Sequence, residues 1–211
     1  KKLKSKTFLP KIIEINKDVN SMTLKKINNP YFVTKGNREN LSFVFKITRI
    51  LKIKDKNLIQ VLKNFNGLKY RQQIIFKSKR LTIINDSKAT SFASSVSILK
   101  SLSNVCWIVG GLAKKGDKFL LQKKECKDFK AYIFGKNKNL FVNELKNKMS
   151  HEFFTDLKSL IKKVFLDIKK NKNHQTILFS PAAASFDSFK NFEDRGKYFN
   201  NIIKKFKNVK R

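Results

Sequence analysis

Short apolar runs alternate with helical patterns between residues 73 and 206, and this alternation constrains the fold more than any other feature. The runs are four or five residues long, as at 105–109 and 176–179, which is typical of strands buried on both faces. The segments between them repeat apolar residues three and four positions apart, most clearly at 157–168. Such alternation is typical of βαβ units, so we predict an α/β fold with a mostly parallel, doubly wound sheet.

The predicted elements follow one another in a regular order. Strands are expected at 73–77, 81–84, 105–109, 131–134, 151–154 and 176–179, and helices at 90–102, 120–126, 140–149, 157–168 and 189–206. Two helical patterns precede them, the first capped by Asn37 or Asn40 and the second ended by Asn66 and Gly67. The first 21 residues are expected to be strand and loop around the apolar run 8–15, and 22–36 to be connecting structure.

The chain is strongly basic, with 48 Lys and Arg against 15 Asp and Glu in 211 residues and a net charge of +33. Such a charge is typical of proteins that bind nucleic acid. Arginine, which is favoured for reading bases and phosphates, is rare here, and the lysines are spread over the whole chain. We therefore attribute the positive charge to the compositional bias of an AT-rich coding sequence, and we expect no nucleic-acid partner. A basic nucleic-acid-binding module remains the alternative.

Cysteine and histidine usage argues against metal and disulfide sites. Cys106 and Cys126 form no CxxC motif, and His151 and His174 lack metal-ligand spacing. No apolar run reaches the roughly 18 residues that a membrane span needs, and no secretion signal is present. We therefore expect a cytoplasmic protein without a membrane span.

Three polar or glycine-containing stretches directly follow predicted strands. The stretch 180–185 has small side chains, so a bound group could approach its backbone and the Ser185 hydroxyl. In 85–90, one hydroxyl, one ammonium and a second hydroxyl come within one turn, which suits an anion or a nucleotide. In 110–114, two glycines allow a sharp turn before Lys114. Open α/β sheets bind ligands at such strand ends. Each stretch also has a purely structural explanation. Residues 180–185 could be a tight turn, Asp86 could cap a helix, and Lys114 could be an ordinary surface lysine.

The same stretches carry a family resemblance. Residues 180–196, SPAAASFDSFKNFEDRG, resemble the C-terminal signature of the D-glutamate-adding Mur ligases, and NDSKAT at 85–90 and GGLAK at 110–114 resemble two further signatures in the same order. The resemblance covers roughly residues 30–206. It implies that 1–66 is the end of the family's central ATP-binding domain and 67–211 its Rossmann-like, D-glutamate-binding C-terminal domain. A folylpolyglutamate-synthase-like ligase is the alternative enzyme, which the three motifs disfavour.

The resemblance also implies roles for individual residues. For ATP, it assigns Asn37 and Asn40 to the adenine, Arg71 to the phosphates and Asp86 to the ribose. Lys88 would be catalytic and lie toward the reacting groups. The D-glutamate pocket would consist of Thr90, Lys114, Ser185, Phe186 and Phe192. The family usually has a histidine at the position of Gly36 and often has one at the position of Tyr70. Their replacement here weakens the expected ATP contacts.

The family's reaction belongs to peptidoglycan precursor synthesis. ATP phosphorylates the carboxylate of UDP-N-acetylmuramoyl-L-alanine, and the D-glutamate amine then attacks the acyl phosphate to give an amide, ADP and phosphate. Such chemistry needs a phosphate cradle and Mg²⁺ ligands, yet the chain has no GxxxxGK[ST] motif. We therefore expect the Mg²⁺ ligands in a part of the family sequence that this chain does not match. The chain alone should be inactive, and the complete enzyme should be a monomer.

Overall fold

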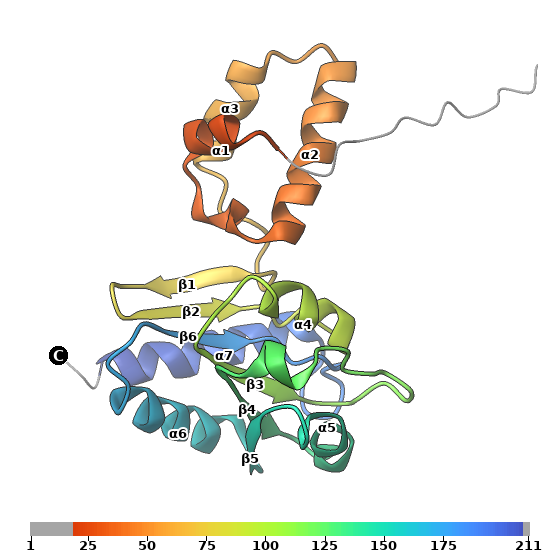
Figure 1. Ribbon diagram of the computed structural model, residues 1–211, viewed down its shortest axis with the longest axis vertical. Helices are drawn as coiled ribbons and strands as arrows, with labels where there is room; N and C mark the ends of the chain where they lie inside the picture. Colours follow the sequence, from red (N-terminus) through yellow and green to blue (C-terminus); the bar gives the residue numbers. More distant parts are fainter. Residues whose placement is uncertain (1–18, 209–211) are drawn as a thin grey trace, which may run out of the picture.

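A computed structural model describes residues 19–208, and the predicted strand around 8–15 lies outside this range. The described chain has two parts, shown in Figure 1. A purely helical part comes first, and a sheet with helices on both faces follows it from residue 73 onward. The two parts meet near residues 67–72.

Four helical elements build the first part: α1 (Ser21–Ile27), the 3₁₀ helix η1 (Pro30–Val33), α2 (Lys35–Ile50) and α3 (Asp55–Lys63). They enclose a small core of Ile27, Phe32, Leu41, Phe45 and Leu62. The prediction of connecting structure at 22–36 was wrong, because Asn20 and Asn29 cap two short helices there by accepting hydrogen bonds from backbone N–H groups.

The helix predicted from Asn37 begins earlier than expected. Thr34 is the cap of α2, and its hydroxyl accepts a hydrogen bond from the backbone N–H of Asn37 at 3.3 Å. The predicted capping role of Asn37 or Asn40 was therefore wrong, since both lie inside the helix. The helix predicted before Asn66 is confirmed as α3, although it already ends at Lys63.

The sheet confirms the predicted α/β class. Its six strands lie in the order β1-β2-β6-β3-β4-β5, and all neighbours are parallel except β1 and β2. Their bounds are β1 (Gln73–Lys77), β2 (Leu81–Asn85), β3 (Val105–Gly110), β4 (Phe129–Phe134), β5 (Ser150–Phe154) and β6 (Gln175–Phe179). The central strands β3 and β6 are buried throughout, as their continuous apolar runs predicted.

Helices cover both faces of this sheet, and each face has its own apolar core. One core includes α4 (Phe92–Leu99) and α5 (Lys138–Leu145), and the other includes α6 (Leu157–Lys169) and α7 (Phe192–Asn208). The helix expected at 120–126 is only the 3₁₀ helix η2 (Lys123–Cys126). Phe119 and Leu121 are buried while Leu120 is exposed, and this alternation belongs to extended chain.

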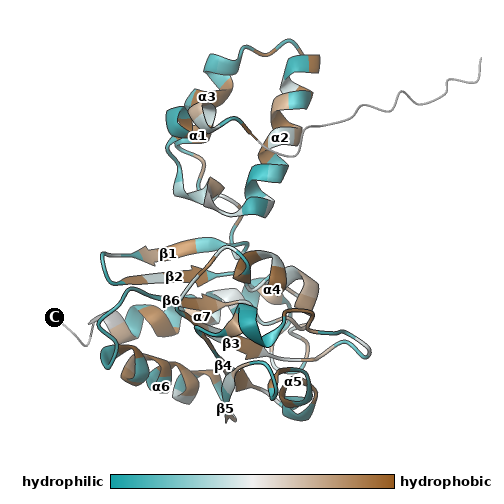
Figure 2. Cartoon of the chain, in the orientation of Figure 1, coloured by the Kyte–Doolittle hydropathy of each residue, from teal (hydrophilic) through white to brown (hydrophobic). Residues whose placement is uncertain are grey.

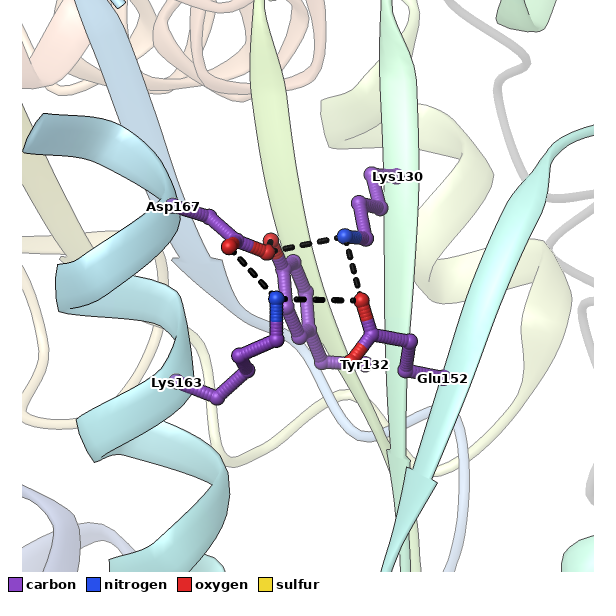
Figure 3. A network of polar contacts seen from close by, with 5 residues as sticks. All are labelled: Lys130, Tyr132, Glu152, Lys163 and Asp167. Atoms are coloured by element: carbon purple, nitrogen blue, oxygen red, sulfur yellow. Dashed lines mark hydrogen bonds and ion pairs between the residues drawn. The ribbon is translucent and has the colours of Figure 1, made fainter. Parts of the chain in front are cut away.

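A charged network joins α6 to strands β4 and β5 (Figure 3). Asp167 accepts hydrogen bonds from Lys130 at 2.8 Å, Tyr132 at 2.8 Å and Lys163 at 2.5 Å. Lys130 also pairs with Glu152 at 2.6 Å. These ion pairs and hydrogen bonds connect the β4–β5 edge of the sheet to helix α6, which packs on it.

Two further features concern the residues 19–208. Cys106 and Cys126 are free thiols, and both are buried. None of the helices in this range is long and apolar enough to cross a membrane.

Candidate functional site

The three stretches singled out in the sequence meet at the carboxyl ends of the neighbouring strands β2, β6 and β3. The N–H of Asp86 donates to the carbonyl of Phe179 at 2.7 Å, which joins the stretch 85–90 to the end of β6. The N–H of Gly110 donates to the carbonyl of Pro181 at 2.9 Å, which joins the stretch 110–114 to the stretch 180–185. In a parallel sheet, this edge is where ligands bind.

Gly111 allows the loops after β3 and β6 to touch. Its φ is +124°, and a Cβ atom at this position would lie 2.7 Å from the carbonyl oxygen of Ala184. Leu112 and Ala184 exchange two backbone hydrogen bonds, at 2.9 and 3.1 Å. This bridge places the loop that carries Lys114 beside the loop that carries Ser185.

The predicted D-glutamate residues differ in exposure. Thr90 and Lys114 are exposed, Phe192 is partly buried, and Phe186 is 71% exposed. Ser185 is only 3% exposed, and its carbonyl accepts hydrogen bonds from the N–H groups of Ser188 and Phe189, which closes a turn. The structure therefore brings the Lys114 and Ser185 loops into direct contact. Thr90 belongs to the loop after β2, on the far side of β6.

A second set of predicted residues lines a cavity of about 290 Å³ between the helical part and the sheet. The cavity takes side chains from α2, from the link between the two parts and from the loop after β2. It is lined by all four residues assigned to ATP and by the predicted catalytic lysine, namely Asn37, Asn40, Arg71, Asp86 and Lys88. Residues from segments about fifty positions apart thus share one cavity.

Asp86 is the carboxylate of this cavity, and it is 6% exposed. Its Oδ1 accepts from the backbone N–H of Gln72 at 3.0 Å, and its Oδ2 accepts from the Ser180 hydroxyl at 2.9 Å. Burial raises the pKa of Asp86 to about 7, although both hydrogen bonds oppose the shift. Asp86 is not the cap of α4, because Ser91 takes that place. Instead, it fastens the link between the two parts to the sheet.

Lys88 connects the cavity with the predicted D-glutamate pocket. Its Nζ lies 3.9 Å from the centre of the Phe192 ring, close enough for a cation–π interaction. Its backbone N–H donates to the carbonyl of Tyr70 at 3.0 Å, so the link between the parts also fixes its position. Asn37 is partly engaged elsewhere, since its Nδ2 donates to the carbonyl of Tyr31 at 2.7 Å.

Arg195 is the residue that the sequence interpretation missed. It is fully buried, and its Nη2 donates to the carbonyls of Ser87 at 2.7 Å and Ala183 at 2.9 Å. Its Nη1 has no hydrogen-bond partner among residues 19–208, and it would lie 3.1 Å from a Cβ atom on Gly111. One guanidinium thus donates hydrogen bonds to the loops after β2 and β6, and it lies close to Gly111 in the loop after β3. The sequence did offer one indication of its importance, because arginine is rare in this chain and lysine is abundant.

Asp187 is the acidic group near this guanidinium. Burial lowers the pKa of Arg195 to about 10, and the charge of Asp187 opposes that shift. Burial likewise raises the pKa of Asp187, and the charge of Arg195 opposes it. The two charges therefore stabilise each other's ionised forms.

No family model matches the chain, but curated proteins align with most of its length. It is 34% identical over 172 residues to the UDP-N-acetylmuramoylalanine–D-glutamate ligase of Wolbachia sp. subsp. Brugia malayi (strain TRS), covering 82% of this chain and 34% of that protein. It is 37% identical over 185 residues to the ligase of the same name from Prochlorococcus marinus (strain MIT 9312), covering 82% and 38%. The chain thus spans well under half the length of these relatives.

Solved Mur ligase structures share the fold. The MurF ligase from Thermotoga maritima in complex with ADP matches 82% of this chain and 39% of its own, with a TM-score of 0.53 and 15% identity. A MurF crystal structure from Acinetobacter baumannii matches 80% and 38%, with a TM-score of 0.56 and 14% identity. The chain is thus a relative of the D-glutamate-adding Mur ligases, it aligns with their C-terminal portion, and its sheet has the fold of a Mur ligase C-terminal domain.

Proposed function

We propose that this chain is the D-glutamate-binding portion of an ATP-dependent ligase that adds D-glutamate to UDP-N-acetylmuramoyl-L-alanine during peptidoglycan precursor synthesis. The observation that carries the proposal is the cavity that gathers Asn37, Asn40, Arg71, Asp86 and Lys88. The names of the relatives support D-glutamate as the amino acid. The complete ligase would act as a monomer in the cytoplasm.

The proposed domain division follows the two parts of the structure. Residues 1–66 would be the end of the central ATP-binding domain, and 67–211 would be the C-terminal domain. The helical part has its own apolar core, and the sheet part has its cores on the two faces of the sheet, which supports a boundary between them. The cavity lies at this boundary, where two domains could close on a nucleotide.

In this proposal, the nucleotide lies in the cavity. Asn40 and Asn37 would contact the adenine edge, and Asp86 would accept a hydrogen bond from the ribose. The exposed Arg71 guanidinium would bind phosphate oxygens, which suits its planar fork of donors. Lys88 lies between the cavity and Phe192, so its ammonium would face the negative charge that develops on the acyl phosphate.

D-glutamate would bind at the three loops next to this cavity. An amino acid with two carboxylates needs an ammonium and hydroxyl donors, which Lys114, Thr90 and Ser185 would supply. Phe186 and Phe192 would flank its aliphatic carbons. After ATP has phosphorylated the substrate carboxylate and left as ADP, the neutral amine nitrogen would attack the acyl carbon. The new C–N bond forms, the bond from that carbon to the phosphate oxygen breaks, and one amine proton leaves with the phosphate.

Mg²⁺, which the family's reaction requires, does not fit the part of the chain that the structure describes. No group of three or more His, Cys, Asp or Glu residues there could hold a metal ion. We therefore assign no step to the metal within this chain, and the chain alone is expected to form no product.

Binding of small ligands to the 211-residue chain tests the proposed function. Saturation-transfer NMR should detect D-glutamate and ATP at separate sites, with much weaker signals for L-glutamate. Failure to bind either ligand would contradict the proposal. Tight binding of an oligonucleotide, with a steep salt dependence that survives mutation of Lys114 and Ser185, would favour the basic nucleic-acid-binding module instead.

A further inference from the structure

Helices α6 and α7 border a groove that contains none of the residues assigned to ATP or D-glutamate. We call it the basic groove, and its volume is about 330 Å³. A second hollow of about 390 Å³ continues it to Leu81 and Gln175, the first residues of strands β2 and β6. The predicted ligand residues follow the last residues of these strands, so the groove extends toward the opposite end of the sheet. Three apolar residues and four lysines line the basic groove: Phe165, Leu166, Phe206, Lys158, Lys162, Lys169 and Lys205.

The floor of the basic groove is apolar. The rings of Phe165 and Phe206 are stacked, with their centroids 5.4 Å apart, and both residues are only partly buried. Leu166, which lies beside them, is 47% exposed. Figure 2 shows hydrophobic and hydrophilic residues alternating along α6. Apolar side chains in a hollow gain free energy when another apolar group covers them, so this floor suits a ligand with apolar side chains.

The rim of the basic groove is positively charged. Its four lysines are exposed, and none of them forms an ion pair within the part of the chain that the structure describes. Arg80 adds a fifth positive charge in the second hollow. No Asp or Glu among residues 19–208 lines either hollow. The groove therefore presents a concentrated positive charge around an apolar floor.

The acidic groups nearest to this rim already have other partners. Asp167 pairs with Lys163, also on α6, at 2.5 Å and with Lys130 at 2.8 Å. Asp156 caps α6 by accepting hydrogen bonds from the backbone N–H groups of Lys158 and Ser159. The helix thus neutralises its lysine in the network of Figure 3 and leaves those of the basic groove to solvent ions or to an acidic partner.

The spacing of the lysines indicates what kind of partner fits. Lys158 and Lys169 are eleven positions apart on α6, which is about 16 Å at the rise of an α-helix. A fatty acid carries one carboxylate and would neutralise one end of such a row. Nucleic-acid phosphates would meet the lysines but bring no apolar side chains to Leu166. A polypeptide segment with acidic and apolar side chains matches both the rim and the floor.

The walls of the groove favour a helical partner. Both walls are helices, whose backbone groups pair within each helix, so a bound segment finds no strand edge here to pair with. A segment that satisfies its own backbone groups while it lies in such a groove is an α-helix. Three turns of helix cover the distance between Lys158 and Lys169.

We propose that the basic groove is the docking site for an acidic amphipathic helix of another protein. The apolar face of this helix would cover Phe165, Leu166 and Phe206, and its carboxylates would pair with the surrounding lysines. The docking site does not depend on the proposed function, because it uses none of the residues assigned to ATP or D-glutamate.

Binding of a synthetic peptide tests the proposal. The probe is a fluorescein-labelled helical peptide of 18 residues, with glutamates on one face and leucine and phenylalanine on the other. Fluorescence anisotropy with the full 211-residue chain at 150 mM salt, which screens distant charges, should give a Kd of about 10 µM or lower. The same peptide with glutamine in place of glutamate, or with serine in place of its apolar residues, should bind at least about tenfold more weakly. No binding of the original peptide at about 1 mM would overturn the proposal.

A matched pair of variants separates the groove from the general charge of the chain. Lys162→Glu with Lys169→Glu should weaken binding on the order of tenfold or more, because it places like charges opposite the peptide. Lys56→Glu with Lys63→Glu is the control, since these lysines are also exposed, lie seven positions apart on α3 and change the net charge equally. It should change binding less than about threefold. Equal losses for the two double variants would contradict a site in the groove.

A third variant and a labelling experiment test the floor and the other occupants. Leu166→Ser keeps every charge and should weaken binding about tenfold, and an unchanged affinity would mean attraction by charge alone. Circular dichroism confirms that each variant is folded. Acetylation of Lys162 and Lys169 should be fast in the chain alone and slow with the peptide. Slow acetylation without the peptide would mean that this chain or a second copy already covers the groove, and tighter binding of an oligonucleotide or of anionic vesicles at the same lysines would assign it to those ligands. Either result would overturn the proposal.

Discussion

Arg195 donates two hydrogen bonds to Ser87, from Nε to the hydroxyl at 3.1 Å and from Nη2 to the carbonyl oxygen at 2.7 Å. Both residues are completely buried. The same guanidinium reaches Ala183 in the loop after β6, so one side chain holds two of the loops that carry predicted ligand-binding residues.

Arg195→Ala should therefore destabilise the protein strongly. It leaves the polar groups of Ser87 and Ala183 without their partner and opens a cavity, which together should cost about 3 kcal/mol or more of the free energy of unfolding. Urea denaturation measures this loss. Arg80→Ala, which removes only exposed hydrogen bonds to two carbonyls, should cost less than about 1 kcal/mol. Equal losses for both variants would show that Arg195 does not hold the site together.

Lys114→Ala should weaken D-glutamate binding without affecting ATP. Lys114 follows the Leu112–Ala184 bridge beside Ser185, whereas the residues assigned to ATP line a separate cavity. Loss of a charge partner costs roughly 2–5 kcal/mol, or on the order of 30-fold or more in affinity. Lys114→Arg should restore binding only partly, because the guanidinium is larger and planar. Calorimetric titration measures both ligands, with Lys172→Ala as the control. An unchanged D-glutamate affinity would remove Lys114 from the pocket.

Asp86 should make stability fall as the pH rises toward neutrality. Its folded pKa of about 7 exceeds the ordinary value of 3.8, so the folded protein binds more protons than the unfolded chain between these values. The stability gained from neutral Asp86 is complete below about pH 4 and is lost as the pH rises through 7. Asp86→Asn should remove this dependence, which amounts to roughly 4 kcal/mol. Urea denaturation of both proteins at pH 4, 6 and 8 checks it, and parallel curves would contradict it.

Asp167 should have the opposite pH dependence. Burial would raise its pKa, but hydrogen bonds from Lys130, Lys163 and Tyr132 hold the pKa well below its usual range. Its contribution to stability is therefore present above the unfolded value of 3.8 and is lost as the pH falls through the lower folded value. Asp167→Asn should cost roughly 2 kcal/mol at pH 7 and much less in strong acid.

Asp55→Asn is the matched control for that experiment. It breaks the Arg49–Asp55 ion pair, in which both side chains are largely exposed, and should cost less than about 1 kcal/mol. If it destabilised the protein as much as Asp167→Asn, the network of Figure 3 would have no special role.

The sheet could be predicted because its strands are defined locally. β3 and β6 are continuous apolar runs, and α6 is amphipathic over 13 residues. The helix α1 was missed because it has seven residues and is defined mainly by its Asn20 cap and by packing of Ile27. Short elements of this kind depend on tertiary contacts more than on their own sequence pattern.

The site was only partly predictable for a similar reason. The motifs marked the three loops, but the role of Asp86 depends on Gln72 and Ser180, which lie 14 and 94 positions away. The role of Arg195 depends on Ser87, 108 positions away. Sequence spacing places residues within one turn or strand and gives no such pairings across the fold. The predicted ligand roles stay predictions until binding is measured.

The place of β6 between β2 and β3 has a consequence for how the protein is made. Until residues 175–179 leave the ribosome, the growing chain has only two incomplete half-sheets, β1 with β2 and β3 with β4 and β5. Inserting the last strand joins them, and the helix that follows brings in Arg195. The edge that carries the predicted ligand residues is therefore assembled last. A chain truncated before residue 175 would have a split sheet in which the edges of β2 and β3 are also exposed, which makes it prone to aggregation.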